Sequence, residues 1–280
     1  MRNLLRDFSF GLRLYRRNPG FSALGVLILA LGIGATAAIF SLIDGILLNP
    51  LPYRDPGRLA VVWSDFGKFG GSRHAFTSPA DYFDWRDRNR SFESMAAYFN
   101  TNRTFTGLDQ PLTPLAHEVT ANFFDVLGVR AFRGRTFLPG EDRPGRDRVA
   151  VISHSLWQSL FAGSEAAIGK PVELDGTNSI LVGVLPPGFR VPNNAITAQP
   201  DLWVPASFES QRQERLSRSL VVFGRLRPGV SDGTARAEMV TLAQQIAREN
   251  PASTNAPDAA VQLIRDDLTN DFRGLFLLLL

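Results

Sequence analysis

One stretch of the sequence holds the residue types from which phosphate-binding loops are built. Gly163, Gly169 and Lys170 follow one another in the order that such a loop uses to hold nucleotide phosphates. The two glycines are one residue too far apart, however, and Pro171 stands where a hydroxyl side chain would hold magnesium. We therefore predict that this stretch does not bind a nucleotide.

Histidines are the next candidates, for metal binding or hydrolysis. His117 is followed by Glu118, as in the metalloprotease helix, but no second histidine comes four residues after the first. His154 lies between two serines without the strand–turn–helix nucleophile motif of hydrolases. His74 is distant in sequence from both. We expect all three histidines to be surface or polar-core residues.

Paired carboxylates could serve acid–base chemistry. Asp81 and Asp84 are nearly one helical turn apart, but acids in the first turn of a helix usually interact with the helix dipole. Gly32 and Gly34 lack the third glycine of a dinucleotide-binding fingerprint. We therefore predict no catalytic, cofactor-binding or metal-binding residue in this chain, and no enzymatic activity.

Composition and charge exclude further classes of protein. The 280 residues include no cysteine, which excludes disulfides, iron–sulfur clusters and thiol catalysis. The formal net charge is +3, and residues 1–20 hold five arginines against one aspartate, so the remainder is close to neutral. A nucleic-acid surface would need basic residues clustered on the folded part. We predict no nucleic-acid partner.

The first element that would position the rest is an apolar stretch, residues 21–48. No charged side chain occurs from Phe21 to Ile43, and a helix of that length reaches roughly 35 Å, enough to cross a bilayer core. The arginines before it favour a cytoplasmic amino terminus, with residues 1–20 forming a basic amphipathic helix on the membrane surface. The alternative is a signal peptide cleaved at Ala35–Ala37, but the apolar run is too long for a typical signal core.

Hydrophobic periodicity and capping residues predict an α+β domain over residues 49–271. Strand–helix–strand patterns cover residues 58–106 and 219–266, and we expect these segments to pack together with residues 107–218 inserted between them. Residues 272–280 begin another apolar run, too short to span a membrane by itself. The predicted strands are 59–63, 95–105, 149–152, 172–174, 180–184, 220–226 and 261–263, and the predicted helices follow Ser78, Ser153 and Ser231 or end at Gly128.

Several short sequence segments follow one another along the chain in a characteristic order. They are Leu12–Ser22, Leu31–Phe40, Val151–Gln158, Leu160–Phe161, Ile168–Pro171, Leu174–Gly176, Val182–Phe189 and Gly224–Val230. Together they resemble the permease subunits of the MacB/FtsX superfamily of ABC transporters. The first two are similar to the opening of the duplicated orphan MacB-type permeases common in acidobacteria, and the others to the family's periplasmic core domain.

The resemblance implies a permease subunit in the bacterial inner membrane, with a cytoplasmic amino terminus and its main domain in the periplasm. In this family a cytoplasmic ABC ATPase binds the ATP, so this chain would hold no cofactor of its own. ATP-driven motion of the membrane helices is passed to the periplasmic domain for export or efflux, a mechanism called mechanotransmission. The implied fold has porter-like strand–helix–strand units and an inserted subdomain. The implied partners are membrane lipids, the ATPase and a second permease half in a homodimer or pseudo-dimer.

The sequence also departs from the family pattern. Family members have four membrane helices or a doubled set, and they contact the ATPase through a loop beyond the second helix. Here residues 272–280 correspond to the truncated start of that second helix, so we expect these 280 residues alone not to recruit an ATPase. The alternative function is a free-standing, membrane-anchored periplasmic domain that binds a partner or ligand without any ATPase.

Overall fold

The computed structural model describes residues 20, 24–25, 27–34, 53–192, 198–251 and 257–265. The chain divides into two compact units, Met1–Pro50 and Leu51–Leu280. In the first unit the described residues are helical, and the large apolar side chains among them are exposed. No helix within the described residues has both the length and the apolar character needed to cross a membrane.

Three sequence predictions fall wholly or mainly outside the described residues. These are the basic helix over residues 1–20, most of the apolar stretch 21–48, and the tail 272–280. They stay predictions.

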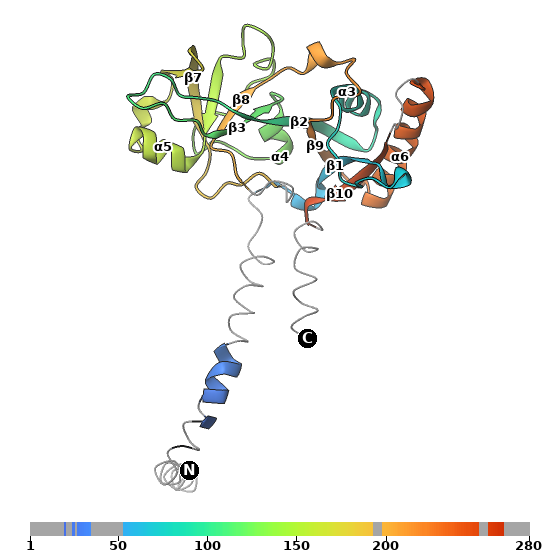
Figure 1. The fold of residues 1–280 in the computed structure, drawn as a ribbon, viewed down its shortest axis with the longest axis horizontal. Helices are drawn as coiled ribbons and strands as arrows, with labels where there is room; N and C mark the ends of the chain where they lie inside the picture. Colours follow the sequence, from blue (N-terminus) through green and yellow to red (C-terminus); the bar gives the residue numbers. More distant parts are fainter. Residues whose placement is uncertain are drawn as a thin grey trace. The chain divides into compact units, whose positions relative to one another are not determined.

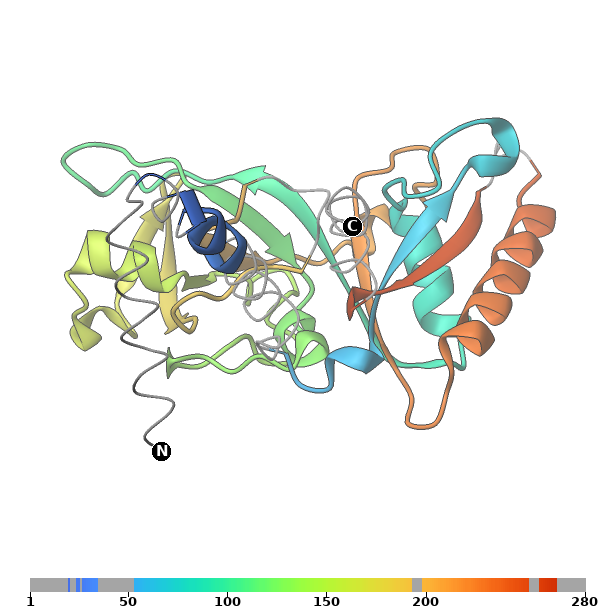
Figure 2. The same cartoon turned by 90° about the horizontal axis from the view of Figure 1, so that it is seen from below.

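The described part of the second unit is built on one sheet of ten strands with helices on its faces (Figures 1 and 2). The strand order is β10-β1-β9-β2-β3-β8-β5-β7-β4, and β6 pairs with β7. The strands are β1 (Leu59–Asp65), β2 (Phe92–Asn102), β3 (Leu115–Val119), β4 (Arg133–Gly134), β5 (Val149–Ile152), β6 (Pro171–Leu174), β7 (Thr177–Val184), β8 (Leu202–Pro205), β9 (Val221–Leu226) and β10 (Asp258–Leu263). The helices are α3 (Pro79–Arg88), α4 (Phe123–Leu127), α5 (His154–Phe161) and α6 (Asp232–Glu249), with short 3-10 turns at Pro56–Arg58, Gly67–Phe69, Glu165–Ala167 and Glu209–Gln211.

The sheet has two halves that meet at β2. We call β10, β1, β9 and β2 the terminal half, because these strands come from the two ends of the domain, and we call the strands from β3 to β8 the central half. Strand β2 pairs with β9 over Phe92–Tyr98 and with β3 over Tyr98–Asn102. Tyr98 therefore has a partner on both sides, and the two halves share a single strand at their boundary.

The hydrophobic core lies in layers on the two faces of this sheet. On one face, α3 and α6 cover a cluster in the terminal half, and a separate cluster in the central half includes Leu156 and Trp157 of α5. On the other face a single cluster runs across both halves and includes the buried residues of α4. The two halves thus share a core on one face and have separate cores on the other.

Local sequence signals account for where the helices begin. Ser78, Ser153 and Ser231 each accept a hydrogen bond at Oγ from the backbone N–H three residues later, at 3.2, 3.0 and 3.1 Å, as expected of N-cap residues. The short helix α4 ends at Gly128, whose φ of 71° is a left-handed conformation that favours glycine. These predicted helix boundaries are confirmed, and so is the mixed helix–strand fold.

The predicted strands 172–174 and 180–184 lie within β6 and β7, which pair as an antiparallel hairpin. Asp175 and Gly176 both have positive φ, 50° and 74°, which matches the backbone twist of the two strands they connect. The predicted bounds of β2 were inaccurate, since it begins at Phe92 and ends at Asn102 rather than spanning 95–105. The sequence analysis did not predict β8.

Candidate functional site

The segment that resembles a phosphate loop connects the end of α5 to the start of β6. A phosphate-binding loop runs from a strand into the amino terminus of a helix, whose free N–H groups bind the anion. Here the chain runs in the opposite sense, from a helix into a strand. Lys170 is exposed at the end of this connection, so the segment does not have the geometry of a nucleotide site.

The serines around His154 act as a helix cap. Ser153 accepts a hydrogen bond from the N–H of Leu156 and donates one to the Asp201 carboxylate, and Ser155 lies 3.0 Å from Ser153. The His154 ring instead packs edge-on against Phe132, at 5.4 Å between centroids. In a catalytic triad the imidazole lies between serine and aspartate, whereas here serine and aspartate are in direct contact.

His117 is fully buried in the sheet, on β3. Its ring stacks on Tyr98 with 4.3 Å between centroids and 11° between planes. Neither ring nitrogen has a hydrogen-bond partner among the described residues, and burial lowers the pKa of His117 to about 3. Glu118 pairs instead with Arg103. The described residues include no group of acids and histidines that could hold a metal ion. His117 is a buried residue of the sheet, and Glu118 is partly exposed.

The two aspartates of α3 anchor a connection between the halves of the sheet. We call residues 206–220, which lead from β8 to β9, the strap. Arg215 of the strap binds Asp81 at 2.9 Å and Asp84 at 2.6 Å, and Arg218 binds the other oxygen of Asp81 at 2.9 Å. The sequence analysis assigned these acids to the helix dipole and missed the arginines, because more than a hundred residues separate the partners along the chain.

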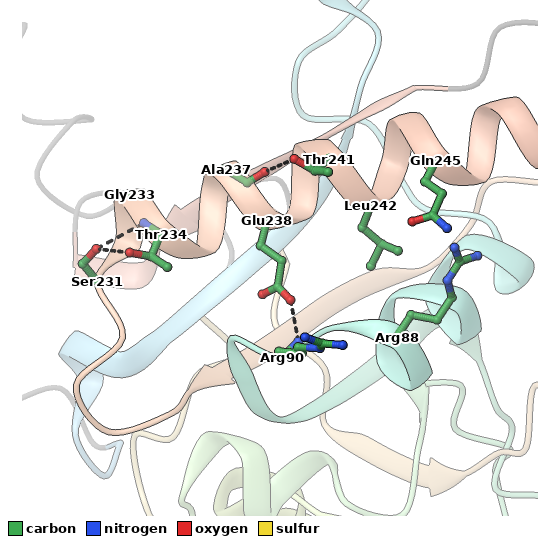
Figure 3. Close-up of a pocket in the computed structure, with 10 residues that line it drawn as sticks. All are labelled: Arg88, Arg90, Ser231, Gly233, Thr234, Ala237, Glu238, Thr241, Leu242 and Gln245. Atoms are coloured by element: carbon green, nitrogen blue, oxygen red, sulfur yellow. Dashed lines mark hydrogen bonds between the residues drawn. The ribbon is translucent and has the colours of Figure 1, made fainter.

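An open groove of about 910 Å³ lies between α6 and the turn from α3 to β2 (Figure 3). Glu238 of α6 accepts hydrogen bonds from the backbone N–H groups of Arg90, at 2.7 Å, and Ser91, at 2.8 Å. Arg88 makes two hydrogen bonds to the Glu249 carboxylate, at 2.7 and 2.9 Å. These charged groups therefore hold α6 against the turn.

The segment that leads into the domain is fastened at several points. We call residues 53–58 the leading segment. The Tyr53 hydroxyl donates to the carbonyl of Arg190 at 2.6 Å, and Arg58 donates from Nε and Nη2 to the carbonyl of Leu226 at 2.8 and 2.6 Å. Asp55 has a φ of 46°, a left-handed conformation that is uncommon for a residue other than glycine. The surroundings therefore hold the leading segment in a defined path.

Arg225 of β9 is the most unusual side chain near that segment. It is 1% exposed, and it donates from Nε to the carbonyl of Val126 at 2.8 Å and from Nη1 to the carbonyl of Arg54 at 2.7 Å. Burial, with further repulsion from Arg54 and Arg58, lowers the pKa of Arg225. Within the described residues its Nη2 has no hydrogen-bond partner. Among the described residues no carboxylate forms an ion pair with Arg225. Burial of such a cation is costly, and the hydrogen bonds to the two carbonyls offset part of that cost.

Gly128 lies beside the contact between Arg225 and the leading segment. A Cβ atom added at Gly128 would lie 2.5 Å from Cβ of Arg54 and 3.0 Å from its backbone nitrogen. The backbone of the leading segment therefore lies directly against the end of α4. Sequence analysis could not find this arrangement, because an arginine within a strand and a glycine at a helix end are common local features.

The described domain is thus a layered, mixed helix–strand domain. Residues 22–242 match the MacB-like periplasmic core domain family. Because the match covers most of the chain, the protein belongs to this family, which confirms the resemblance seen in the sequence.

Solved structures share the fold. The periplasmic region of MacB from Actinobacillus actinomycetemcomitans has a TM-score of 0.57 at 15% identity, covering 82% of this chain and 98% of that one. A domain of a putative permease protein from Porphyromonas gingivalis has a TM-score of 0.56 at 14% identity, covering 75% and 92%. The extracellular domain of the noncanonic ABC-type transporter YknZ from Gram-positive bacteria has a TM-score of 0.50 at 16% identity, covering 73% and 99%. No curated protein matches the sequence.

Proposed function

We propose that this chain is the amino-terminal part of the permease subunit of a MacB-like ABC transporter, which exports its substrate by passing the motion of a cytoplasmic ATPase to a periplasmic domain. The observation that carries the proposal is the family match over residues 22–242. The shared fold with the periplasmic region of MacB and with the extracellular domain of an ABC-type transporter supports it. In this proposal the ATPase binds the ATP, and the chain acts by position and contact.

The proposed topology is a cytoplasmic amino terminus, a membrane helix within residues 21–48 and a periplasmic domain. Its support is the uncharged run from Phe21 to Ile43 and the five arginines before it. The exposed turn at residues 143–147 is a suitable insertion site for reporters, because it precedes β5 and its side chains face solvent. Alkaline phosphatase inserted there should be active, and a fluorescent protein that folds only in the cytoplasm should be dark.

A matched control separates topology from expression. Replacing the five arginines of residues 1–20 by glutamine should reduce the phosphatase activity per molecule, since the positive flank is what favours the proposed orientation. An inactive phosphatase fusion together with a fluorescent signal from the fluorescent-protein fusion would contradict the proposed topology. A mature protein whose first residue lies near Phe40 would contradict it too.

We further propose that the terminal half is the porter-like part, residues 58–106 and 219–266, and that residues 107–218 form the inserted subdomain. The adjacency of β1, β2, β9 and β10 in the sheet supports this division. So does the packing of α3 and α6 in one hydrophobic cluster.

The proposed partners are membrane lipids, a cytoplasmic ABC ATPase and a second permease half. The test is purification of the protein from membranes that also contain the ATPase encoded beside it. The ATPase should be recovered in a stoichiometric amount with the full-length permease and lost when the loop beyond its second membrane helix is exchanged for an unrelated sequence. Equal recovery with both proteins would show that the ATPase does not recognise this permease through that loop. The absence of any ATPase in either preparation would favour a free-standing binding domain.

A further inference from the structure

The leading segment connects to both halves of the sheet through two adjacent residues. Tyr53 contacts the central half, because its hydroxyl donates to the carbonyl of Arg190 at 2.6 Å and its ring lies edge-on to Phe189 at 6.5 Å. Residues 189 and 190 belong to the connection between β7 and β8 of the central half. Arg54 contacts the terminal half, because its carbonyl accepts from Arg225 of β9 at 2.7 Å.

The second contact is rigid. Arg225 is buried and binds the carbonyl of Val126 at the end of α4 as well as that of Arg54, so its planar guanidinium is held at two points. Gly128 lies against the backbone of Arg54 on the same side. The backbone at residue 54 is therefore held between β9 and the end of α4.

The two halves are also joined in a way that permits bending. In the sheet they share strand β2 alone, and the strap joins them outside the sheet through its ion pairs with α3. On the face covered by α3, α6 and α5 their cores are separate clusters. On the opposite face the shared cluster includes Tyr53 itself. A rotation about β2 would thus be opposed by the shared cluster that includes Tyr53 and by the ion pairs between the strap and α3.

We propose that Tyr53 and Arg225 are positioning residues that set the angle between the two halves, and that the leading segment transmits a displacement of the preceding chain to that angle. The positioning role of Tyr53 and Arg225 does not depend on any transporter activity. The second part rests on the proposed function, because it requires an ATPase-driven motion of the membrane segment.

The angle between the two halves can be measured with a pair of spin labels. Since it contains no cysteine, spin labels can be placed at Ala166→Cys in the central half and Gln244→Cys on α6, both exposed positions. Pulsed electron paramagnetic resonance on the full chain in lipid nanodiscs then gives the distribution of distances between the halves. Tyr53→Phe removes only the hydroxyl and its hydrogen bond to the central half.

The control for Tyr53→Phe is Thr241→Val. The Thr241 hydroxyl also donates to a backbone carbonyl, that of Ala237 at 2.8 Å, but both residues lie within α6. In Tyr53→Phe we expect a second distance population at roughly 2- to 10-fold its wild-type level, the factor that loss of one hydrogen bond allows. In Thr241→Val the distribution should superimpose on that of the wild type. A Tyr53→Phe distribution that also superimposes on the wild type would overturn the proposal.

Arg225→Lys distinguishes geometry from charge. Lysine keeps the positive charge but lacks the planar fork that holds two carbonyls at once. We expect the same second population as in Tyr53→Phe, whereas a role of the charge alone would leave the wild-type distribution. The melting temperature of each variant, followed by circular dichroism, must show that the distances are measured on folded protein.

A final arm separates this inference from the proposed function. In the complex of the full-length permease with the ATPase, adding ATP should shift the wild-type distance distribution, and Tyr53→Phe should reduce that shift at least about twofold. If the wild type shows no ATP response while Tyr53→Phe still creates the second population, the coupling to an ATPase is wrong and the positioning role stands. If ATP shifts both proteins equally, the leading segment does not transmit the motion.

Discussion

Acidification from pH 7 to pH 5 is expected to destabilise the domain through a single buried side chain, His117. This imidazole is 0% exposed, and burial alone lowers its pKa from the ordinary 6.5 to about 3. Its neighbours across the sheet, Asn100 and Trp203, are uncharged. In the folded protein His117 therefore stays neutral over the whole range between these two pKa values.

The magnitude follows from proton linkage. Below pH 6.5 the unfolded chain binds a proton at His117 that the folded chain does not bind, so the free energy of unfolding falls as the pH falls, until about pH 3. The slope is about 1.4 kcal/mol per pH unit, which gives a loss of about 2 kcal/mol at pH 5. The range between pH 7 and pH 5 isolates this effect from carboxylates such as Glu141. Burial works against ionisation of that group, but hydrogen bonds from Arg135 hold the pKa of Glu141 below its ordinary 4.5.

The assay is urea denaturation followed by tryptophan fluorescence, on the full chain in mild detergent at pH 7, 6 and 5. The four tryptophans all lie in the described domain. His117→Leu removes the titrating group and replaces a buried imidazole whose nitrogens lack partners among the described residues. We expect this variant to be at least as stable as the wild type at pH 7 and to lose less than about 0.5 kcal/mol by pH 5.

Val119→Ala is the matched control, since Val119 is a fully buried residue on the same strand. It should lower the stability by about 1–3 kcal/mol at every pH, because it creates a cavity without removing a titrating group. The reasoning is refuted if His117→Leu and the wild type show the same pH dependence, or if Val119→Ala alone abolishes it.

Three further outcomes are expected. Gly128→Ala should lower the free energy of unfolding by about 2–4 kcal/mol in the same denaturation assay. Gly145→Ala, with the same sign of φ but open space around it, should lower it by only about 1 kcal/mol, and equal losses would disprove the close packing at the leading segment. Asp81→Asn breaks the half-buried ion pairs with the strap and should lower the free energy of unfolding by about 3 kcal/mol. Glu165→Gln, in an exposed ion pair, should lower it by less than about 1 kcal/mol, and an equally small effect of Asp81→Asn would show that these ion pairs do not hold the strap. Calorimetric titration of the purified chain with magnesium ATP should give no stoichiometric binding, because the connection over residues 163–170 runs from a helix into a strand, and a saturable signal would contradict this.

Much of the fold could be predicted from the sequence because its signals are local. A serine N-cap acts on an N–H group three residues later, and the turn at Asp175 and Gly176 requires positive φ from the residues themselves. Such features keep their meaning whatever the rest of the chain does. The order of the sequence segments that resemble the family, and the lack of a complete nucleotide-binding or metal-binding motif, can also be read directly from the sequence.

The contacts of the leading segment and of the strap could not be predicted, because each of them joins distant parts of the chain. Arg225 meets Arg54 across 171 residues, Tyr53 meets Arg190 across 137, and Arg215 meets Asp81 across 134. No periodicity in the sequence distinguishes these arginines from those that lie at the surface. Only the pairing of the strands brings them to their partners.

His117 shows the same division most clearly. By type and spacing it is a lone histidine followed by a glutamate, and the sequence by itself excluded only the metalloprotease motif. The pairing of β3 with β2 and β8 is what buries its ring against Tyr98. Burial then lowers its pKa, because the charged form of a side chain is penalised by the loss of water, and the extent of that loss is a property of the tertiary structure.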